Sequence, residues 1–256
     1  MPTDFSGLPP AFLAAAFVVT LFAGFVKGAV GFAMPMIMIS ALSSFLPAPV
    51  ALAALIVPTV LTNIAQACRG GVGAAVESIV TYKRLIGSVV LFIFLSAPLV
   101  AVLPDAALYL LLGGPILLFT VTQLLGKQLI LPAHRRHRAE VMMGALGGFF
   151  GGVSGVWGPP VIAYLLSFNT EKTEALRVQG VVFLLGGVML LVSHVGSGVL
   201  NAQTAPLSVA MVVPAGLGMW LGFKVHDRLD AARFRKATLF VLSLAAANLI
   251  RKGLMG

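Results

Sequence analysis

Long runs without a charged residue constrain this chain more than any other feature of its sequence. Such runs cover residues 28–68, 85–104, 106–126, 141–170, 178–223 and 237–250. A helix needs about 20 apolar residues to cross the hydrocarbon core of a membrane, and most of these runs are that long. A membrane β-barrel would instead show alternating apolar and polar residues in segments of about ten. The sequence therefore predicts an all-α polytopic membrane protein.

The positive charges gather in three short hydrophilic segments. Of the 17 Lys and Arg residues, 12 lie within 69–84, 127–140 and 224–236. Short basic loops beside apolar segments tend to stay in the cytoplasm, so the net charge of +9 indicates topology and not a nucleic-acid surface. The run HRRHR at 134–138 could also contact anionic lipid headgroups. We expect a multi-pass protein of the bacterial inner membrane that binds no nucleic acid.

Prolines and small polar clusters divide the apolar sequence into eight segments. They fall near residues 9–42, 49–67, 85–104, 106–126, 141–167, 177–200, 205–223 and 237–250. The longest polar segment, 127–140, lies almost at the centre of the chain. We therefore expect a first membrane repeat over 1–126, a basic cytoplasmic linker over 127–140, and a second membrane repeat over 141–256.

The two halves share a pattern of glycine and proline. The run GFVKGAVGFAMP begins at Gly24, and GFFGGVSGVWGP begins 124 residues later at Gly148. At this one offset, without a gap, three glycines and a proline of the first run meet the same residue types in the second. The matched residues are Gly24, Gly28, Gly31 and Pro35 with Gly148, Gly152, Gly155 and Pro159. This coincidence predicts an internal duplication of four segments in each half.

The basic segments favour one arrangement of the repeats. If all eight segments crossed the membrane, 224–236 would lie on the side opposite to 69–84 and 127–140. If the first segment of each half is re-entrant, each half crosses three times and the halves are inverted. All three basic segments then lie in the cytoplasm, as the positive-inside tendency requires. We expect six crossings and two re-entrant hairpins, although 9–26 alone is nearly long enough to cross.

The glycine and proline runs predict a broken helix at the start of each half. Glycine costs a helix about 1 kcal/mol relative to alanine, and proline about 3 kcal/mol. Freed backbone groups in a membrane are tolerated where they line protein or a water-filled cavity, and the start of the following helix attracts anions. Lys27 adds a full positive charge, although a lysine can also extend to the membrane interface. Close helix packing through small residues explains part of the glycine pattern.

The polar residues of the apolar segments point to an anionic ligand. No Asp or Glu lies inside these segments, whereas cation carriers usually need a buried carboxylate. Amide side chains would suit the oxygens of a sulfonate, sulfate or carboxylate, or they form hydrogen bonds between helices. The substrate-binding candidates are Lys27, Gly28, Gly31, Asn63, Gln66, Gly152, Ser154, Gly155, Trp157 and Gln179. The candidates for the helix breaks are Gly24, Pro35, Gly148, Gly158, Pro159 and Pro160. We expect no metal site and no cofactor.

The paired runs resemble the two repeats of the TauE/SafE sulfite-exporter family. The resemblance rests on GFVKGAVGFAMPMIMISAL with APVALAALIVPTVLTNIAQ, and on GGFFGGVSGVWGPPVIAYLL after the basic linker. It covers nearly the whole chain and implies secondary transport of an organic or sulfur oxyanion, often outward. The residues that match the family pattern are Gly24, Gly28, Gly31, Pro35, Asn63, Gly148, Gly152, Gly155, Gly158 and Pro159. The first run departs from it at GFAMP, where the family commonly has further glycines.

These observations predict a secondary transporter of small organic or sulfur-containing anions that exports its substrate by alternating access. An anion or small-solute channel and a carboxylate transporter of the same fold are the alternatives. An enzyme is disfavoured because no nucleophile and base are paired in the sequence, and a metal-cation transporter because buried carboxylates are missing. The expected partners are the small anion, the lipid bilayer, a coupling ion such as H+ or Na+, and a second copy of the chain.

Overall fold

The computed structural model describes residues 9–68, 71–126, 132–225 and 231–255, and all its regular elements are helices. In the first half these are α1 (Pro10–Val30), α2 (Met34–Leu42), α3 (Ala48–Ala67), α4 (Val72–Thr81), α5 (Lys83–Ser96), α6 (Leu99–Val102) and α7 (Asp105–Leu124). The second half has η2 (Ala133–Arg135), α8 (Arg136–Ser154), α9 (Gly158–Ser167), α10 (Lys172–Gly196), α11 (Ala205–Ala210), α12 (Val212–Val225) and α13 (Ala231–Met255).

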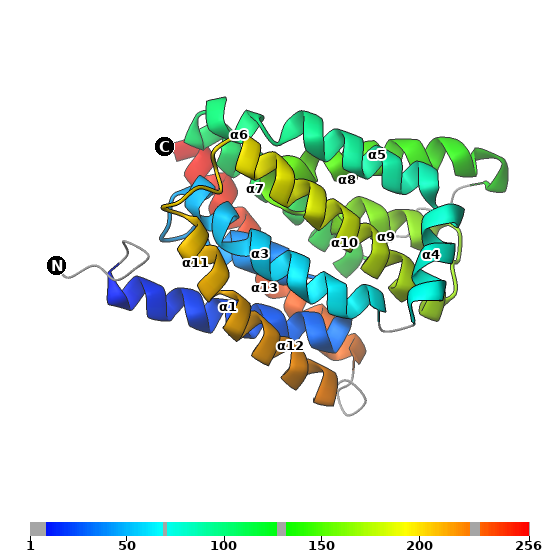
Figure 1. Ribbon diagram of the computed structural model, residues 1–256, viewed down its shortest axis with the longest axis horizontal. Coiled ribbons are helices and arrows are strands. Elements are labelled where there is room, and N and C mark those ends of the chain that lie inside the picture. Colours follow the sequence, from blue (N-terminus) through cyan, green and yellow to red (C-terminus); the bar gives the residue numbers. More distant parts are fainter. Residues whose placement is uncertain (1–8, 69–70, 127–131, 226–230, 256) are drawn as a thin grey trace.

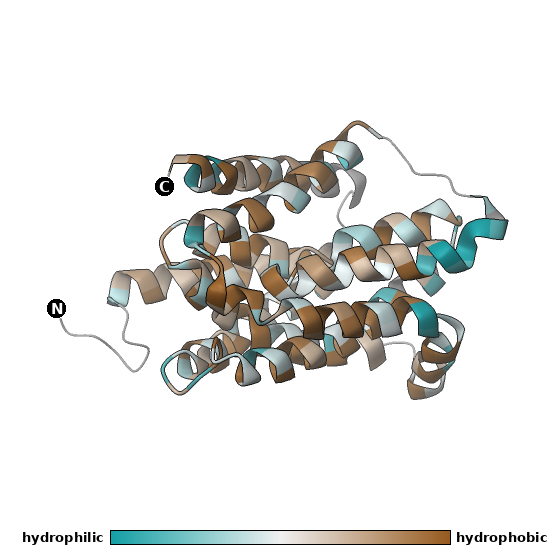
Figure 2. Ribbon diagram, turned by 90° about the horizontal axis from the view of Figure 1, so that it is seen from above, coloured by the Kyte–Doolittle hydropathy of each residue, from teal (hydrophilic) through white to brown (hydrophobic). Residues whose placement is uncertain are grey.

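Seven helices among the described residues are long and apolar enough to cross a membrane. They are Pro10–Ala29, Ala48–Ala67, Lys83–Val102, Asp105–Leu124, Arg177–Gly196, Ala205–Lys224 and Thr238–Met255. Large apolar side chains such as Val18, Phe94 and Leu118 remain more than half exposed, as suits side chains in contact with lipid. Figure 2 shows hydrophobic colour along the helices and hydrophilic colour gathered where α8 begins. The prediction of an all-α multi-pass membrane protein is confirmed.

The helices pack in pairs that join the two halves of the chain. The most extensive packing is of α1 with α12, α5 with α8, α7 with α13, and α3 with α10. The axes of the long helices are roughly aligned, and α3 and α10 lie near the centre of the molecule (Figure 1). Each of these pairs takes one helix from before the basic linker and one from after it. The core is therefore shared between the halves.

Each of the two broken segments returns to the end of the bundle from which it starts. The ring of Phe12, early in α1, lies 5.7 Å from the ring of Phe45, which follows α2. In the second half, the Tyr164 hydroxyl near the end of α9 donates to Glu140 near the start of α8, at 2.9 Å. Figure 1 shows α1 beginning at the end where the chain terminates, and α8 beginning at the opposite end.

The segment 69–84 differs from the expected loop. Residues Val72–Thr81 form the helix α4, which lies across the end of the bundle where α8 begins (Figure 1). Its sequence VGAAVESIVT contains no proline, and Arg177 of α10 donates from Nε to the Ser78 hydroxyl at 3.0 Å. The basic residues at this position thus flank a short surface helix. The neighbouring ends of α12 and α13 lie at the same end of the molecule.

Candidate functional site

The first helix break occupies residues 31–33. The α1 helix ends when Gly31 adopts a left-handed conformation with φ of 85°, and its N–H donates to the Lys27 carbonyl at 2.7 Å. Ala33 is also left-handed, with φ of 79°, and α2 follows at once with Pro35 in its first turn. Glycine adopts this conformation without steric cost, and proline is favoured in a first helical turn. The glycine–proline pattern therefore specifies the break locally.

The second break, at residues 155–157, also begins with a left-handed glycine, but the residue before the next helix, Trp157, is right-handed with φ of −99°. Gly155 is left-handed with φ of 70°, and its N–H donates to the Gly151 carbonyl at 2.7 Å. The Ser154 hydroxyl donates to the Phe150 carbonyl at 2.6 Å and accepts the Val156 N–H at 3.1 Å, so it supplies an acceptor where the helix stops. The α9 helix then begins at Gly158 with two prolines in its first turn. Ser154 supports the break and does not line the cavity described below.

Four of the predicted glycines lie inside helices and not at the breaks. Gly24 and Gly28 belong to α1, where an added Cβ would meet the backbone of α12 at Ala215 and Met219. The corresponding glycines of α8 allow the same close approach to α5: a Cβ on Gly148 would lie 2.7 Å from the Phe92 Cβ. The expectation that Gly24 and Gly148 form the breaks therefore differs from the structure. Because they lack side chains, they bring two helix backbones together instead.

Gly152 also contributes through its backbone. An added Cβ there would lie 2.7 Å from the Ile93 carbonyl oxygen of α5, so this glycine packs α8 against α5. Its carbonyl lies 2.8 Å from Nε2 of the buried His194 of α10, whose Nδ1 lies 3.3 Å from the Ser197 hydroxyl. His194 is thus hydrogen-bonded through both ring nitrogens. Gly152 joins three helices beside the second break and does not line the cavity.

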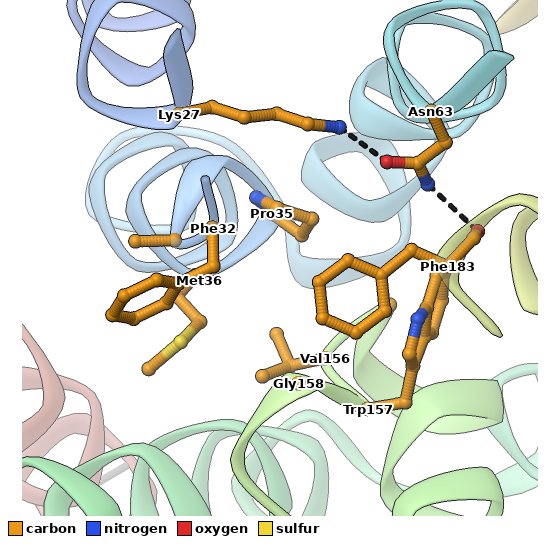
Figure 3. A pocket seen from close by; sticks show the side chains of 11 residues that line it. Lys27, Phe32, Pro35, Met36, Asn63, Val156, Trp157, Gly158 and Phe183 are labelled. Atoms are coloured by element: carbon orange, nitrogen blue, oxygen red, sulfur yellow. Dashed lines mark hydrogen bonds between the residues drawn. The ribbon is translucent and has the colours of Figure 1, made fainter. Parts of the chain in front are cut away.

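Lys27 is buried between α1 and α3. Its side chain is 2% exposed, and Nζ donates to the Thr62 hydroxyl at 2.9 Å and to the Asn63 side-chain oxygen. The Asn63 amide nitrogen in turn donates to the Phe183 carbonyl of α10 at 2.7 Å (Figure 3). Within the described part of the chain, the side-chain oxygens that Lys27 contacts belong to neutral groups. Lys27 therefore places an amino group, with neutral partners among the described residues, at the centre of three helices.

A cavity lies where the two breaks meet α3 and α10. It encloses about 350 Å³ of empty space, counting its mouth. Its lining consists of Lys27, Phe32, Ala33, Pro35, Met36, Asn63, Gly155, Val156, Trp157, Gly158 and Phe183. Figure 3 shows Lys27 and Asn63 on one side, with Trp157 and Phe183 across from the first break. Only about 20 Å³ of this space is open to the centre of a water-sized molecule, so the cavity in this conformation holds about one water and must widen to admit an anion.

The structure brings together four of the predicted substrate-binding residues. Lys27, Asn63, Gly155 and Trp157 line the cavity, as do Pro35 and Gly158 from the predicted breaks. Gln66 lies elsewhere: its Nε2 donates to the Gly31 carbonyl at 2.9 Å and so holds the first break in place. Gln179, Gly28 and Gly31 also lie outside the lining, as do Pro159 and Pro160. The gathered residues combine one cation, one amide and an aromatic wall.

Sequence reasoning did not identify several lining residues. Phe183 is one of 17 phenylalanines, and no local pattern distinguishes it from those that face lipid. Phe32 and Val156 occupy the breaks, and their position inside the glycine and proline runs was the available signal. Thr62 precedes Asn63, and its contact with Lys27 depends on how α1 packs against α3.

A second polar cluster closes the end of the bundle where α8 begins. Glu140 is 3% exposed and lies 3.7 Å from Arg136 and 4.0 Å from Arg84. Beside it, the Tyr82 hydroxyl donates to Glu174 at 2.7 Å, and burial together with this bond raises the pKa of Tyr82 to about 12. The cluster ties the α4–α5 junction to α8, α9 and α10 at some distance from the cavity lining.

Comparison with known proteins identifies a family. The family model described as sulfite exporter TauE/SafE matches residues 16–249, which is nearly the whole chain. Comparisons with curated proteins and with solved structures gave no match. The matched region contains both helix breaks and every residue that lines the cavity. The resemblance inferred from the two glycine- and proline-rich runs is confirmed.

Proposed function

Because this chain belongs to the TauE/SafE sulfite-exporter family, we propose that it is a secondary transporter of small organic or sulfur-containing anions. Proteins of this family are membrane transporters and not enzymes. The cavity between the breaks is the proposed binding site. Sulfite, small sulfonates and small carboxylates are the candidate substrates, because each presents oxygens that an ammonium group and an amide bind well.

The buried Lys27 ammonium carries this proposal. A lysine inside a membrane protein is costly, and such residues mark functional sites unless they reach the interface. Here Nζ contacts Thr62 and Asn63 at the cavity, where neutral oxygens replace part of its hydration. An anion that enters the cavity supplies the missing countercharge. The lysine is therefore more stable with an anion present than without one, which is the basis of affinity.

The arrangement of helices supports two inverted repeats. The third α-helices of the halves, α3 and α10, begin 124 residues apart at Ala48 and Lys172, the same offset that relates the two breaks. Each broken segment returns to its starting end, and the two start from opposite ends of the bundle (Figure 1). In such transporters the binding site lies between the repeats, and access alternates as one moves against the other.

The proposed direction of transport is outward. With the basic segments in the cytoplasm, the end formed by α4 and the start of α8 faces the cytoplasm of a bacterial cell. The membrane potential, negative inside, drives an anion outward, so export does not require a coupling proton. We propose export along this potential; coupling to H+ or Na+ would add to the driving force.

Transport by reconstituted protein tests the proposal. Purified protein in liposomes is expected to accelerate efflux of methanesulfonate or sulfite, and an inside-negative potential is expected to increase the rate. Lys27→Met should reduce the rate at least tenfold, because it removes the only charge in the described cavity lining. Lys83→Met, at the exposed start of α5, removes an equal charge from the surface and should leave the rate unchanged.

Three outcomes would contradict the proposal. If the wild-type protein moved none of the sulfur oxyanions or carboxylates in this assay, the transport function would be wrong. If Lys27→Met transported them as fast as Lys83→Met, the cavity would not be the binding site. A rate that never saturates with substrate would identify a channel in place of a carrier.

A further inference from the structure

The two sides of the cavity carry opposite chemistry at corresponding positions. Lys27 lies four residues before the left-handed Gly31, whereas Gly151 lies four residues before the left-handed Gly155. Asn63 is the sixteenth residue of α3, and the sixteenth residue of α10 is Gly187. The first half therefore supplies a cation and an amide at positions where the second half supplies no side chain.

The indole of Trp157 fills the space beside Gly151 and the neighbouring Gly186, whereas a Cβ on Gly187 would lie against Val60 and Asn63. A Cβ added to Gly151 would lie 3.0 Å from Cε3 of Trp157, and one added to Gly186 would lie 3.3 Å from its Cε2. The indole thus lies between α8 and α10, where side chains corresponding to Lys27 and Thr62 would otherwise extend. The residue corresponding to Trp157 in the first break is Ala33, so the second half has a large side chain at the position where the first half has a small one.

The backbone of the second break is also the poorer anion site. In the first three residues of α2, Met34 and Met36 carry an N–H, and only Pro35 does not. In α9, Gly158 is the only one of the first three residues with an N–H, because Pro159 and Pro160 follow it. The side chains of Lys27 and Asn63 and the free backbone N–H groups of α2 therefore both favour an anion at the first break over an anion at the second.

The remaining wall of the cavity is apolar. Trp157 and Phe183 pack edge to face, with ring centroids 6.2 Å apart, and Val156 lies beside them (Figure 3). Within the described lining, Lys27 is the only charged side chain. A ligand with one negative charge can place it against Lys27 and direct the rest of the molecule to this wall. A ligand with two charges would bury the second one against aromatic carbon, which is strongly unfavourable.

We propose that the cavity selects small organic anions with one negative charge and an apolar end over anions with two charges such as sulfate. This inference rests on the proposed function, since it assumes that the cavity binds the transported anion. The selectivity comes from the Trp157 side chain together with the single cation. Lengthening an alkyl sulfonate by one methylene therefore tightens binding about three- to fourfold, until the cavity is full.

Direct binding of anions that differ in charge and in apolar length tests the proposal. Binding of methanesulfonate, ethanesulfonate, ethane-1,2-disulfonate and sulfate is measured by titration calorimetry on the purified full-length protein in nanodiscs. Ethanesulfonate is expected to bind more tightly than methanesulfonate. It should also bind at least tenfold more tightly than ethane-1,2-disulfonate or sulfate. Equal or tighter binding of the disulfonate would overturn the proposal.

Two variants assign the selectivity to the indole. Trp157→Ala, which copies the residue of the first break, should abolish the difference between ethanesulfonate and methanesulfonate. Trp157→Phe keeps an aromatic wall and should retain most of the difference, so it remains informative if the alanine variant does not fold. If both variants fold and retain the wild-type difference, Trp157 does not set specificity.

Failure of this inference is distinguishable from failure of the proposed function. If anions bind, Lys27→Met abolishes their binding, and sulfate binds as tightly as ethanesulfonate, the transport site stands and only the selectivity is wrong. If no anion binds to the wild-type protein, the transport site itself is wrong and the inference falls with it.

Discussion

Asn63 connects the charged group of the cavity to the opposite half of the chain. Its oxygen accepts from Lys27 of α1, and its nitrogen donates to the Phe183 carbonyl of α10 at 2.7 Å. An anion that binds Lys27 competes with this oxygen for the ammonium protons. We therefore expect the Asn63 side chain to shift when an anion binds in the cavity, which would alter its hydrogen bond to α10.

The Asn63→Asp variant tests this role. A carboxylate at this position would pair with Lys27 and remove the charge available to the substrate, so anion affinity should fall at least tenfold. Asn63→Ser keeps a hydroxyl beside the ammonium without a negative charge, and its affinity should fall less. Titration calorimetry with ethanesulfonate measures both. An aspartate variant that binds as tightly as the wild type would exclude direct competition.

At the scale of helices, paired glycines set how closely α1 and α8 approach their partners. A Cβ at Gly148 would lie 2.5 Å from the Val89 carbonyl oxygen and 2.7 Å from the Phe92 Cβ, both in α5. Gly87, also in α5, has no neighbouring atom within 4 Å of such a Cβ. An added methyl group would therefore clash with α5 at Gly148 and would meet nothing at Gly87.

Gly148→Ala should lower the thermal unfolding temperature of the protein, because the helices must separate or distort to admit the methyl group. Gly87→Ala is the matched control and should leave that temperature unchanged or raise it, since alanine is favoured over glycine by about 1 kcal/mol in a helix. Unfolding is followed by fluorescence of the purified protein in detergent. Equal effects of the two substitutions would mean that the close approach of α5 and α8 contributes nothing to stability.

The helix breaks were predictable from sequence, whereas the helix partners were not. A left-handed glycine and a proline in the next turn act on their own backbone, so Gly31 with Pro35 and Gly155 with Pro159 specify the breaks locally. The pairing of α1 with α12 depends on two small-residue surfaces that resemble many others in the chain. Lys27 was recognisable because charge is rare in this sequence, whereas Phe183 was hidden among similar residues.

At the scale of the whole molecule, the proposed re-entrant arrangement of the two broken segments makes a prediction about sidedness. Inverted repeats with two re-entrant hairpins put His134 and Glu171 on the cytoplasmic side and Asn201 on the outer side. Eight full crossings would instead put His134 and Asn201 on one side and Glu171 on the other. All three positions are exposed, so each is open to chemical labelling.

Single cysteines at these positions distinguish the two arrangements. The chain has one native cysteine, the exposed Cys68, so Cys68→Ser provides a background without thiols. In intact cells a membrane-impermeant maleimide should label Asn201→Cys and leave His134→Cys and Glu171→Cys unlabelled. After the cells are opened, all three should react. Opposite labelling of positions 134 and 171 in intact cells would contradict the re-entrant arrangement.

The pairing of helices across the two halves also determines the order in which the pairs can form while the chain is synthesised. The ribosome makes α1 first and its partner α12 almost last, whereas only α6, α7 and the linker separate α5 from its partner α8. The face of α1 that carries Gly24 and Gly28 therefore stays in contact with lipid or with the insertion machinery until residue 225 has emerged. A chain that terminates after α11 leaves this face uncovered, and quality-control proteases that recognise unpaired membrane helices should remove it.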